Sequence, residues 1–281
     1  MVRKVLTYDI SEVVPYINWL YFYHVWGLNG KPETERQQLR QEAMNVLHAW
    51  CGEYHTHAIF ALYAANSDID DVLLYPDDSH DDKIIRIPML RQQHPASSKE
   101  PNLCLADFLR PVHRGEQDQL GVFCASVDRE LTEKYRGDEY AEMLAQVLCD
   151  RLAEATVEKM HEQVRRREWG YAPDEQLTIP QLLHCEYQGI RPAVGYPSLP
   201  DVSVNFTLDR LLDMGEIGIR LTEIGMMTPH ASVSGFMFAH PQARYFDLGK
   251  IDEEQLCDYA RRRGVPVELM RRYLLSSLWK R

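Results

Sequence analysis

The 281-residue sequence lacks the long apolar runs that a membrane-spanning helix requires. Such a helix needs about 18 uninterrupted apolar residues. The most apolar stretch near the start, Trp19 to Leu28, is broken by tyrosine, histidine and glycine. Residues 1–12 carry some positive charge, but no apolar stretch follows them, so they are not typical of a secretory signal. We therefore expect a cytoplasmic protein.

Paired cysteines and an excess of basic residues are also absent. No two cysteines form a C-x-x-C pair, and they are irregularly spaced at Cys51, Cys104, Cys124, Cys149, Cys185 and Cys257. This spacing favours reduced thiols over a disulfide framework or a zinc site. The chain has 31 lysines and arginines against 42 aspartates and glutamates, a net charge of −11. Nucleic acids and anionic membranes, which attract basic surfaces, are therefore poor candidate partners.

Common catalytic signatures are missing as well. The sequence has no glycine-rich phosphate loop, no G-x-S-x-G and no H-E-x-x-H. His55 and His57 could share one face of a strand, but no third ligand is near, and a structural role is more common for such a pair. We therefore predict neither a catalytic residue nor a metal site in this chain.

Hydrophobic periodicity predicts four helices and several strands. The helices are expected at 32–50, 138–167, 251–263 and 266–278, and the strands at 56–63, 83–89, 119–125 and 233–239. Because strands and helices do not alternate regularly, we expect one α+β domain, residues 1–281, with a mainly antiparallel sheet.

Three details complete this prediction. In the longest helix, Glu154, Glu158 and Glu162 are expected beside or opposite the apolar stripe. The acidic stretch 68–83 is expected to form two short strands or a hairpin. The stretch 94–101 has the composition of a loop.

The most unusual segment is GIRPAVGYPSLP, residues 189–200. Its three prolines and two glycines exclude a helix or a central strand, so we expect a rigid loop that fixes Arg191 and Tyr196. The planar guanidinium of Arg191 suits a carboxylate ligand, and Gly195 lets a ligand approach the backbone. The alternative, of equal weight on composition, is a structural loop in which Arg191 pairs with an acidic residue of the protein.

Two further segments leave their roles open. Residues 221–246 contain small residues, an apolar strand and then Tyr245 and Phe246, for which an ordinary strand and turn is the favoured interpretation. Residues 15–27, PYINWLYFYHVWG, place Asn18 among aromatic side chains. Such a cluster usually belongs to a core, but it can also form the wall of a site for a flat or cationic ligand.

Several motifs occur in a fixed order along nearly the whole chain, from about Val14 to Leu278. They are CLADF (104–108), DRLAEA (150–155), WGYAPD (169–174), GIRPAVGYP (189–197), LTE (221–223), ASVSG (231–235), HP (240–241) with Tyr245, and DYARR (258–262). Together they resemble the activation domain of cobalamin-dependent methionine synthase. So many motifs in register make the resemblance specific.

The resemblance implies a single C-shaped α+β domain with a twisted antiparallel sheet and flanking helices. It also implies an S-adenosylmethionine-binding component of a methyltransferase that docks on a cobalamin domain and reactivates cob(II)alamin by reductive methylation. The electron would come from a flavodoxin-like donor. Because no homocysteine, folate or cobalamin domain precedes Met1, we expect a free-standing chain that meets a separate cobalamin-carrying methionine synthase chain.

Matched residue by residue, the resemblance implies an S-adenosylmethionine site. Its members would be Asn18, Glu154, Glu186, Arg191, Pro192, Ala193, Gly195, Tyr196, Tyr245 and Phe246. Arg191 would contact the methionyl carboxylate, while aromatic rings and carboxylates suit the cationic sulfonium.

One member departs from the family pattern. Asn18 stands where the family has an aspartate that binds the ligand's ammonium. An uncharged acceptor weakens this contact by about 1 kcal/mol. The alternative function is therefore a non-catalytic docking or sensing partner of a corrinoid protein, with weakened or lost S-adenosylmethionine binding.

Overall fold

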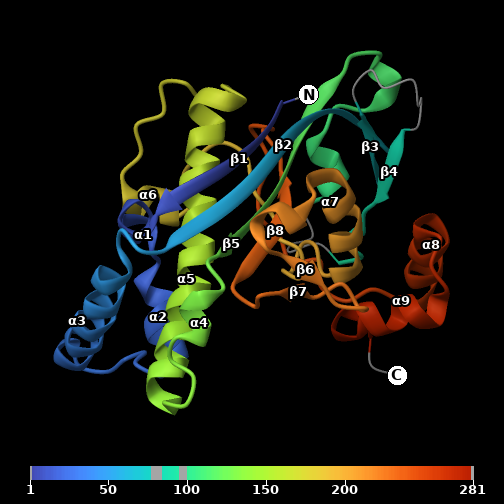
Figure 1. The fold of residues 1–281 in the computed structure, drawn as a ribbon. Coiled ribbons are helices and arrows are strands. Elements are labelled where there is room, and N and C mark those ends of the chain that lie inside the picture. Colours follow the sequence, from blue (N-terminus) through green and yellow to red (C-terminus); the bar gives the residue numbers. More distant parts are fainter. Residues whose placement is uncertain (1, 77–83, 95–99, 280–281) are drawn as a thin grey trace.

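A six-stranded antiparallel sheet forms the centre of the fold (Figure 1). The computed structural model of the protein describes residues 2–76, 84–94 and 100–279. The strands of this sheet are β1 (Val2–Asp9), β2 (His55–Asp68), β3 (Asp71–Tyr75), β4 (Ile85–Pro88), β5 (Asp118–Val127) and β8 (Ser232–Met237). A two-stranded ribbon is formed by β6 (Arg220–Leu221) and β7 (Met227–Thr228). The expected antiparallel sheet is therefore confirmed.

The long strand β2 organises the sheet. One edge of β2 pairs with β5, from Thr56 opposite Val127 to Ala65 opposite Asp118. The other edge is shared, because β1 pairs with its first half and β3 with its second half. Strand β5 pairs in turn with β8, which stands at one end of the strand order.

Helices cover both faces of this sheet. They are α1 (Ile10–Val13), α2 (Trp19–Val25), α3 (Glu33–Trp50), α4 (Glu130–Glu133), α5 (Glu139–Gln163), α6 (Ile179–Leu183), α7 (Asn205–Leu212), α8 (Glu253–Arg263) and α9 (Val267–Tyr273). Helices α1, α2, α3 and α5 enclose one hydrophobic core, and α7 helps to enclose the other. Helices α8 and α9 form a third, smaller core. This arrangement confirms the α+β class.

Alternate residues of the strands face the two larger cores, as the two-residue period of a strand requires. Phe60 of β2 and Phe123 of β5 belong to the core that contains α5. Their chain neighbours Ile59 and Val122 belong to the core that contains α7. Because both faces are covered, the middle strands are apolar on both sides.

Helix α5 is the longest helix and supports the candidate site. Asp138 caps its start by accepting a hydrogen bond from the backbone N–H of Ala141 (3.0 Å). The helix ends in a π-helical turn, Val164–Glu168. Glu158, expected beside or opposite the apolar stripe, is only 3 % exposed. Arg191, from the loop that follows residue 189, pairs with it.

The other helix and strand predictions were largely correct. The helix expected at 32–50 is α3, and those expected near 251–263 and 266–278 are α8 and the shorter α9. The strand at 56–63 is longer than expected because β2 has partners along its whole length. The first strand of the expected 68–83 hairpin is β3, whereas residues 77–83 and most of the loop 94–101 lie outside the described residues.

Several described elements have no counterpart in the predictions: strands β1, β6 and β7 and helices α1, α2, α4, α6 and α7. Strand β1 is mostly exposed and shows no apolar alternation, so it forms because β2 offers it an edge. Helix α2 is rich in aromatic residues, which are weak helix formers. It is stabilised by the burial of Phe22 in the core and by an N-terminal cap from Asn18.

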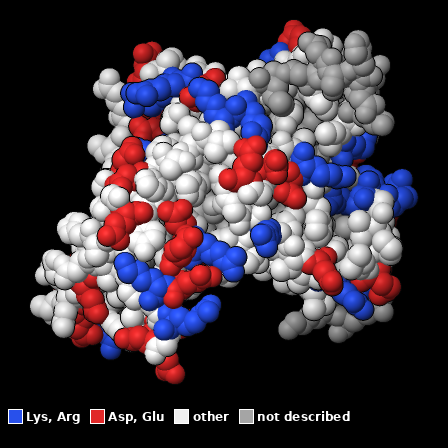
Figure 2. Space-filling view, in the orientation of Figure 1, with Lys and Arg blue, Asp and Glu red and all other residues white. Residues whose placement is uncertain are grey.

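None of the described helices is long and apolar enough to cross a membrane. All six cysteines are unpaired, as the sequence predicted. Acidic and basic side chains are interspersed over the face seen in Figure 2, without a broad basic surface on that side.

Candidate functional site

Residues 189–200 form an irregular loop, as predicted, and this loop lies against the edge strand β8. The carbonyl oxygen of Pro192 accepts a hydrogen bond from the backbone N–H of Phe236 (3.1 Å), and Ala193 forms a bridge with Gly235. Gly235 is required for this approach, because a β-carbon there would clash with the Pro192 carbonyl. The sheet therefore fixes the loop and the side chains that it carries.

Arg191 is the centre of the site. Its side chain is only 14 % exposed, and its Nη2 donates to Oε2 of Glu158 on α5 at 2.5 Å. Its Nη1 lies 4.0 Å from Oε2 of Glu154, one helical turn earlier. Burial opposes the charge of Arg191, but the Glu158 carboxylate holds the pKa of the guanidinium well above its usual value. The guanidinium is therefore charged. Its Nη2 is held by Glu158, whereas its Nη1 makes only the longer contact with Glu154.

Tyr196 lies at the tip of the same loop. Its hydroxyl donates a short hydrogen bond to Oε1 of Glu154. Gly195, with φ of +88°, allows the turn before it, and the Gly195 N–H donates to the carbonyl of Leu199 (2.8 Å). Burial of the hydroxyl and the neighbouring Glu154 charge raise the pKa of Tyr196, which keeps the hydroxyl a donor.

Tyr245 joins the loop to the segment after β8. Its hydroxyl accepts a hydrogen bond from the backbone N–H of Arg191 (3.0 Å) and lies 3.4 Å from the Tyr187 hydroxyl. The Tyr245 residue as a whole is 43 % exposed, but its hydroxyl end is enclosed, and this burial raises its pKa. Residues far apart in the sequence thus meet at the Arg191 backbone.

A buried polar layer lies beneath these residues. The ring of Tyr187 packs edge-on against His161 (centroids 5.0 Å apart) and lies 4.1 Å from the guanidinium carbon of Arg165. Arg165 is fully buried and pairs through two nitrogens with Glu175. Burial, with the positive charges of Arg165 and Arg191, keeps the pKa of His161 well below its usual value, so His161 is neutral.

Several atoms of this layer have no hydrogen-bond partner among the described residues. They are Glu158 Oε1, Arg191 Nε, Arg165 Nη1 and both ring nitrogens of His161. Buried polar groups are normally satisfied, so the layer retains unused capacity for hydrogen bonding. The surrounding charges of Glu154, Glu158 and Arg191 sum to −1, which suits a ligand with a net positive charge.

Asn18 does not lie in the loop that carries Arg191 but at the start of helix α2. Its Oδ1 accepts the backbone N–H of Leu20 (3.1 Å) and caps helix α2, which packs on α5. An asparagine has a single side-chain oxygen, with two lone pairs. The helix cap uses one of them, so the acceptor that the resemblance assigns to the ligand's ammonium is shared with the protein.

Two other expected members are not joined to the Arg191 cluster. The Phe246 ring packs near Phe108 (centroids 6.4 Å apart) in the core that contains α7. Glu186 is exposed, and within the described part of the chain no hydrogen bond or ion pair links it to Arg191. Its neighbour Cys185 lies nearer, because the Tyr187 hydroxyl donates to the Cys185 sulfur at 3.5 Å.

The sequence prediction missed the buried layer beneath Arg191. Its members are Glu158, which pairs with Arg191, and His161, Arg165 and Tyr187, none of which was proposed as a site residue. Glu158 could have been suspected only from its spacing, because it follows Glu154 by four residues and so shares its face of the helix.

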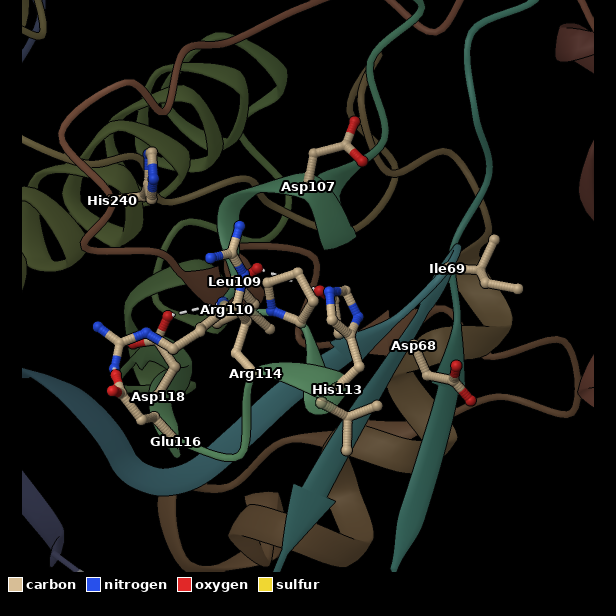
Figure 3. A pocket seen from close by; sticks show the side chains of 13 residues that line it. Asp68, Ile69, Asp107, Leu109, Arg110, His113, Arg114, Glu116, Asp118 and His240 are labelled. Atoms are coloured by element: carbon tan, nitrogen blue, oxygen red, sulfur yellow. Dashed lines mark hydrogen bonds and ion pairs between the residues drawn. The ribbon is translucent and has the colours of Figure 1, made fainter.

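A separate recess of about 840 Å³ opens between the end of β2 and residues 107–118 (Figure 3). Figure 3 shows Arg110 beside Glu116 and Asp118 at one rim, and Asp68 at the opposite side. Asp68 is paired with Arg86 (2.9 Å). None of the predicted ligand-binding residues lines this recess, so it does not belong to the candidate site.

Comparisons with known proteins agree on one family. A family model described as "Vitamin B12 dependent methionine synthase, activation domain" matches residues 9–264. The chain is also similar to a solved structure described as the crystal structure of the MetH reactivation domain bound to AdoHcy. The two chains are 33 % identical with a TM-score of 0.92, and the match covers 100 % of this chain and 91 % of the other. The resemblance inferred from the motifs is confirmed.

Proposed function

Since the chain belongs to the activation-domain family of vitamin B12-dependent methionine synthases, we propose that it binds S-adenosylmethionine and presents the methyl group to cobalamin on a separate methionine synthase chain. The observation that carries this proposal is the guanidinium of Arg191. Its Nη2 is held by Glu158, whereas its Nη1 lies 4.0 Å from Glu154 and can bind a ligand. The similar MetH domain is described as bound to AdoHcy, which is S-adenosylmethionine without its transferable methyl group.

The chain's own groups fit both ends of such a ligand. Arg191 offers a charged donor to the amino-acid carboxylate. Glu154 and the rings of Tyr196 and Tyr245 offer a carboxylate and aromatic faces, which suit a sulfonium. The backbone at Gly195 leaves room for close approach of a ligand, because a β-carbon there would meet only Val202, at 3.8 Å. Pro192 and Ala193 are buried against β8 and fix the position of the loop.

The chemistry itself would take place on the partner's cobalamin. There, one electron and the methyl group of S-adenosylmethionine would convert cob(II)alamin into methylcobalamin, with release of AdoHcy. The electron donor would be flavodoxin-like. The residues of this chain bind and orient the methyl donor, so their contribution is proximity and orientation. No general acid or base is needed for this step.

Calorimetry tests the binding half of the proposal. We expect heat on titration with S-adenosylmethionine and none with adenosine carrying no amino-acid tail at the same concentration. The absence of heat at millimolar S-adenosylmethionine, for the natural chain and for Asn18→Asp, would contradict the proposal. The second half is tested by mixing the chain with a cobalamin-binding methionine synthase chain, a reductant and S-adenosylmethionine, and recording the spectrum of methylcobalamin.

One observation favours a second candidate function. Because Asn18 is uncharged and its oxygen also caps a helix, the chain could have kept the fold while its affinity for S-adenosylmethionine was weakened or lost. It would then act as a docking or sensing partner of a corrinoid protein. Binding of the cobalamin chain without any methylcobalamin formation in the assay above would favour this candidate over the first.

A further inference from the structure

Arg191 and Glu158 come from two elements that are distant in the sequence. Glu158 lies in the middle of the 25-residue helix α5 and is 3 % exposed. Arg191 belongs to an irregular loop. The ion pair of 2.5 Å between them therefore transfers the fixed position of the helix to a loop side chain.

The contacts of Arg191 divide its guanidinium into two parts. Nη2 is held by Glu158, and Nε is enclosed without a partner. Nη1 makes no hydrogen bond among the described residues and lies 4.0 Å from Glu154. A ligand carboxylate would therefore meet the Nη1 arm, while Glu158 stays behind the guanidinium.

Holding the arginine in advance has a clear physical effect. An arginine side chain loses substantial rotamer freedom when it is fixed on a ligand. If the protein has already fixed it, that loss does not weaken binding. Glu158 cannot contact the ligand in this geometry, because its oxygens are buried and one of them is used by Arg191.

We propose that Glu158 is a positioning residue for the methyl donor, which holds one arm of Arg191 so that the other arm meets the carboxylate of S-adenosylmethionine. This inference rests on the proposed function. It predicts that Glu158 matters only for ligands that carry the carboxylate. A purely structural role of Glu158 would affect every ligand of the site alike.

The experiment compares two ligands and two variants by calorimetry. The ligands are S-adenosylmethionine and its decarboxylated form, which keeps the ammonium and the sulfonium. Glu158→Gln should bind S-adenosylmethionine about tenfold more weakly than the natural chain and the decarboxylated ligand equally well. Glu162→Gln is the matched control, because Glu162 is on the same helix but pairs with Arg166 and Tyr16. It should change neither affinity.

Other results would overturn the inference. Unchanged or tighter binding of S-adenosylmethionine by Glu158→Gln would show that Glu158 does not prepare Arg191. Equal weakening of both ligands would show a structural role only. If Glu158→Gln does not fold, Glu158→Asp, which keeps the charge but is shorter, makes the same comparison. Failure of the natural chain to bind S-adenosylmethionine would overturn the proposed function as well, and this result is distinct from the others.

Discussion

The carbonyl oxygen of Pro192 occupies the space that a β-carbon on Gly235 would need. The same oxygen accepts a hydrogen bond from Phe236, the residue after Gly235 (3.1 Å). This contact brings the Arg191 loop directly against the edge of the sheet. A single glycine in β8 thus decides where the guanidinium of the candidate site lies.

The first prediction concerns this close approach. Gly235→Ala should push the loop away and lower the free energy of unfolding by about 1–3 kcal/mol, measured by chemical denaturation. Affinity for S-adenosylmethionine should fall in parallel, because Arg191 moves with the loop. Gly215→Ala is the control, since a β-carbon there would meet nothing nearer than 3.4 Å. Unchanged stability of Gly235→Ala would contradict this prediction, because it would mean that the loop can move away from β8 at little cost in free energy.

The second prediction concerns the fork of Arg191. Arg191→Lys keeps the charge but loses the planar set of donors that can reach Glu158 and a ligand together. We expect affinity for S-adenosylmethionine to fall by about tenfold or more, as measured by calorimetry. Arg244→Lys, at an exposed arginine that pairs with Glu100, should leave the affinity unchanged. Equal affinities for the natural chain and Arg191→Lys would place the carboxylate elsewhere.

The third prediction separates the two roles of Asn18, the cap of helix α2 and the expected contact with the ligand's ammonium. An aspartate there has a second oxygen, so one oxygen can cap α2 while the other meets an ammonium. Asn18→Asp should therefore bind S-adenosylmethionine several-fold more tightly, by about 1 kcal/mol. Asn18→Ala should lose about 1 kcal/mol of stability, because the cap is removed. Unchanged affinity in Asn18→Asp would contradict the assigned contact with the ammonium.

The fourth prediction concerns pH. Burial keeps the pKa of His161 well below its value in the unfolded chain. As the pH falls below about 6.5, the unfolded chain binds a proton at this residue and the folded chain does not, so stability falls. The contribution of His161 should reach about 1.4 kcal/mol per pH unit.

Denaturation of His161→Gln from pH 7.5 to 5 measures this contribution as the difference from the natural chain. The variant should show a shallower loss of stability on acidification. His48→Gln, at an exposed residue of α3, should retain the full slope. Identical slopes for the natural chain and His161→Gln would mean that His161 takes up its proton in the folded protein.

Much of the fold could be read from local patterns. Helices α3 and α8 show apolar residues at helical spacing with suitable charges at their ends, and those signals depend only on neighbours in the chain. Strand β1 was missed because its stability comes from pairing with β2, about fifty residues away. Local sequence carries no record of such a partner.

The candidate site divides in the same way. Composition alone identified loop 189–200 as rigid and Arg191 as a candidate ligand, and the order of the motifs identified the family. Composition could not distinguish an arginine that binds a ligand from one that pairs with an acidic residue of the protein. The structure shows that Arg191 does pair with Glu158, through one arm only, so the two interpretations are compatible.

Local sequence was enough to predict the class of fold, the family and the stiffness of the loop, because backbone restrictions and side-chain periodicity are local properties. Three features became visible in the folded chain alone: the carboxylate that holds Arg191, the burial that keeps His161 neutral beneath it, and the helix cap made by the oxygen of Asn18. Burial and pairing depend on which distant segments cover a residue, and only the packed chain specifies this.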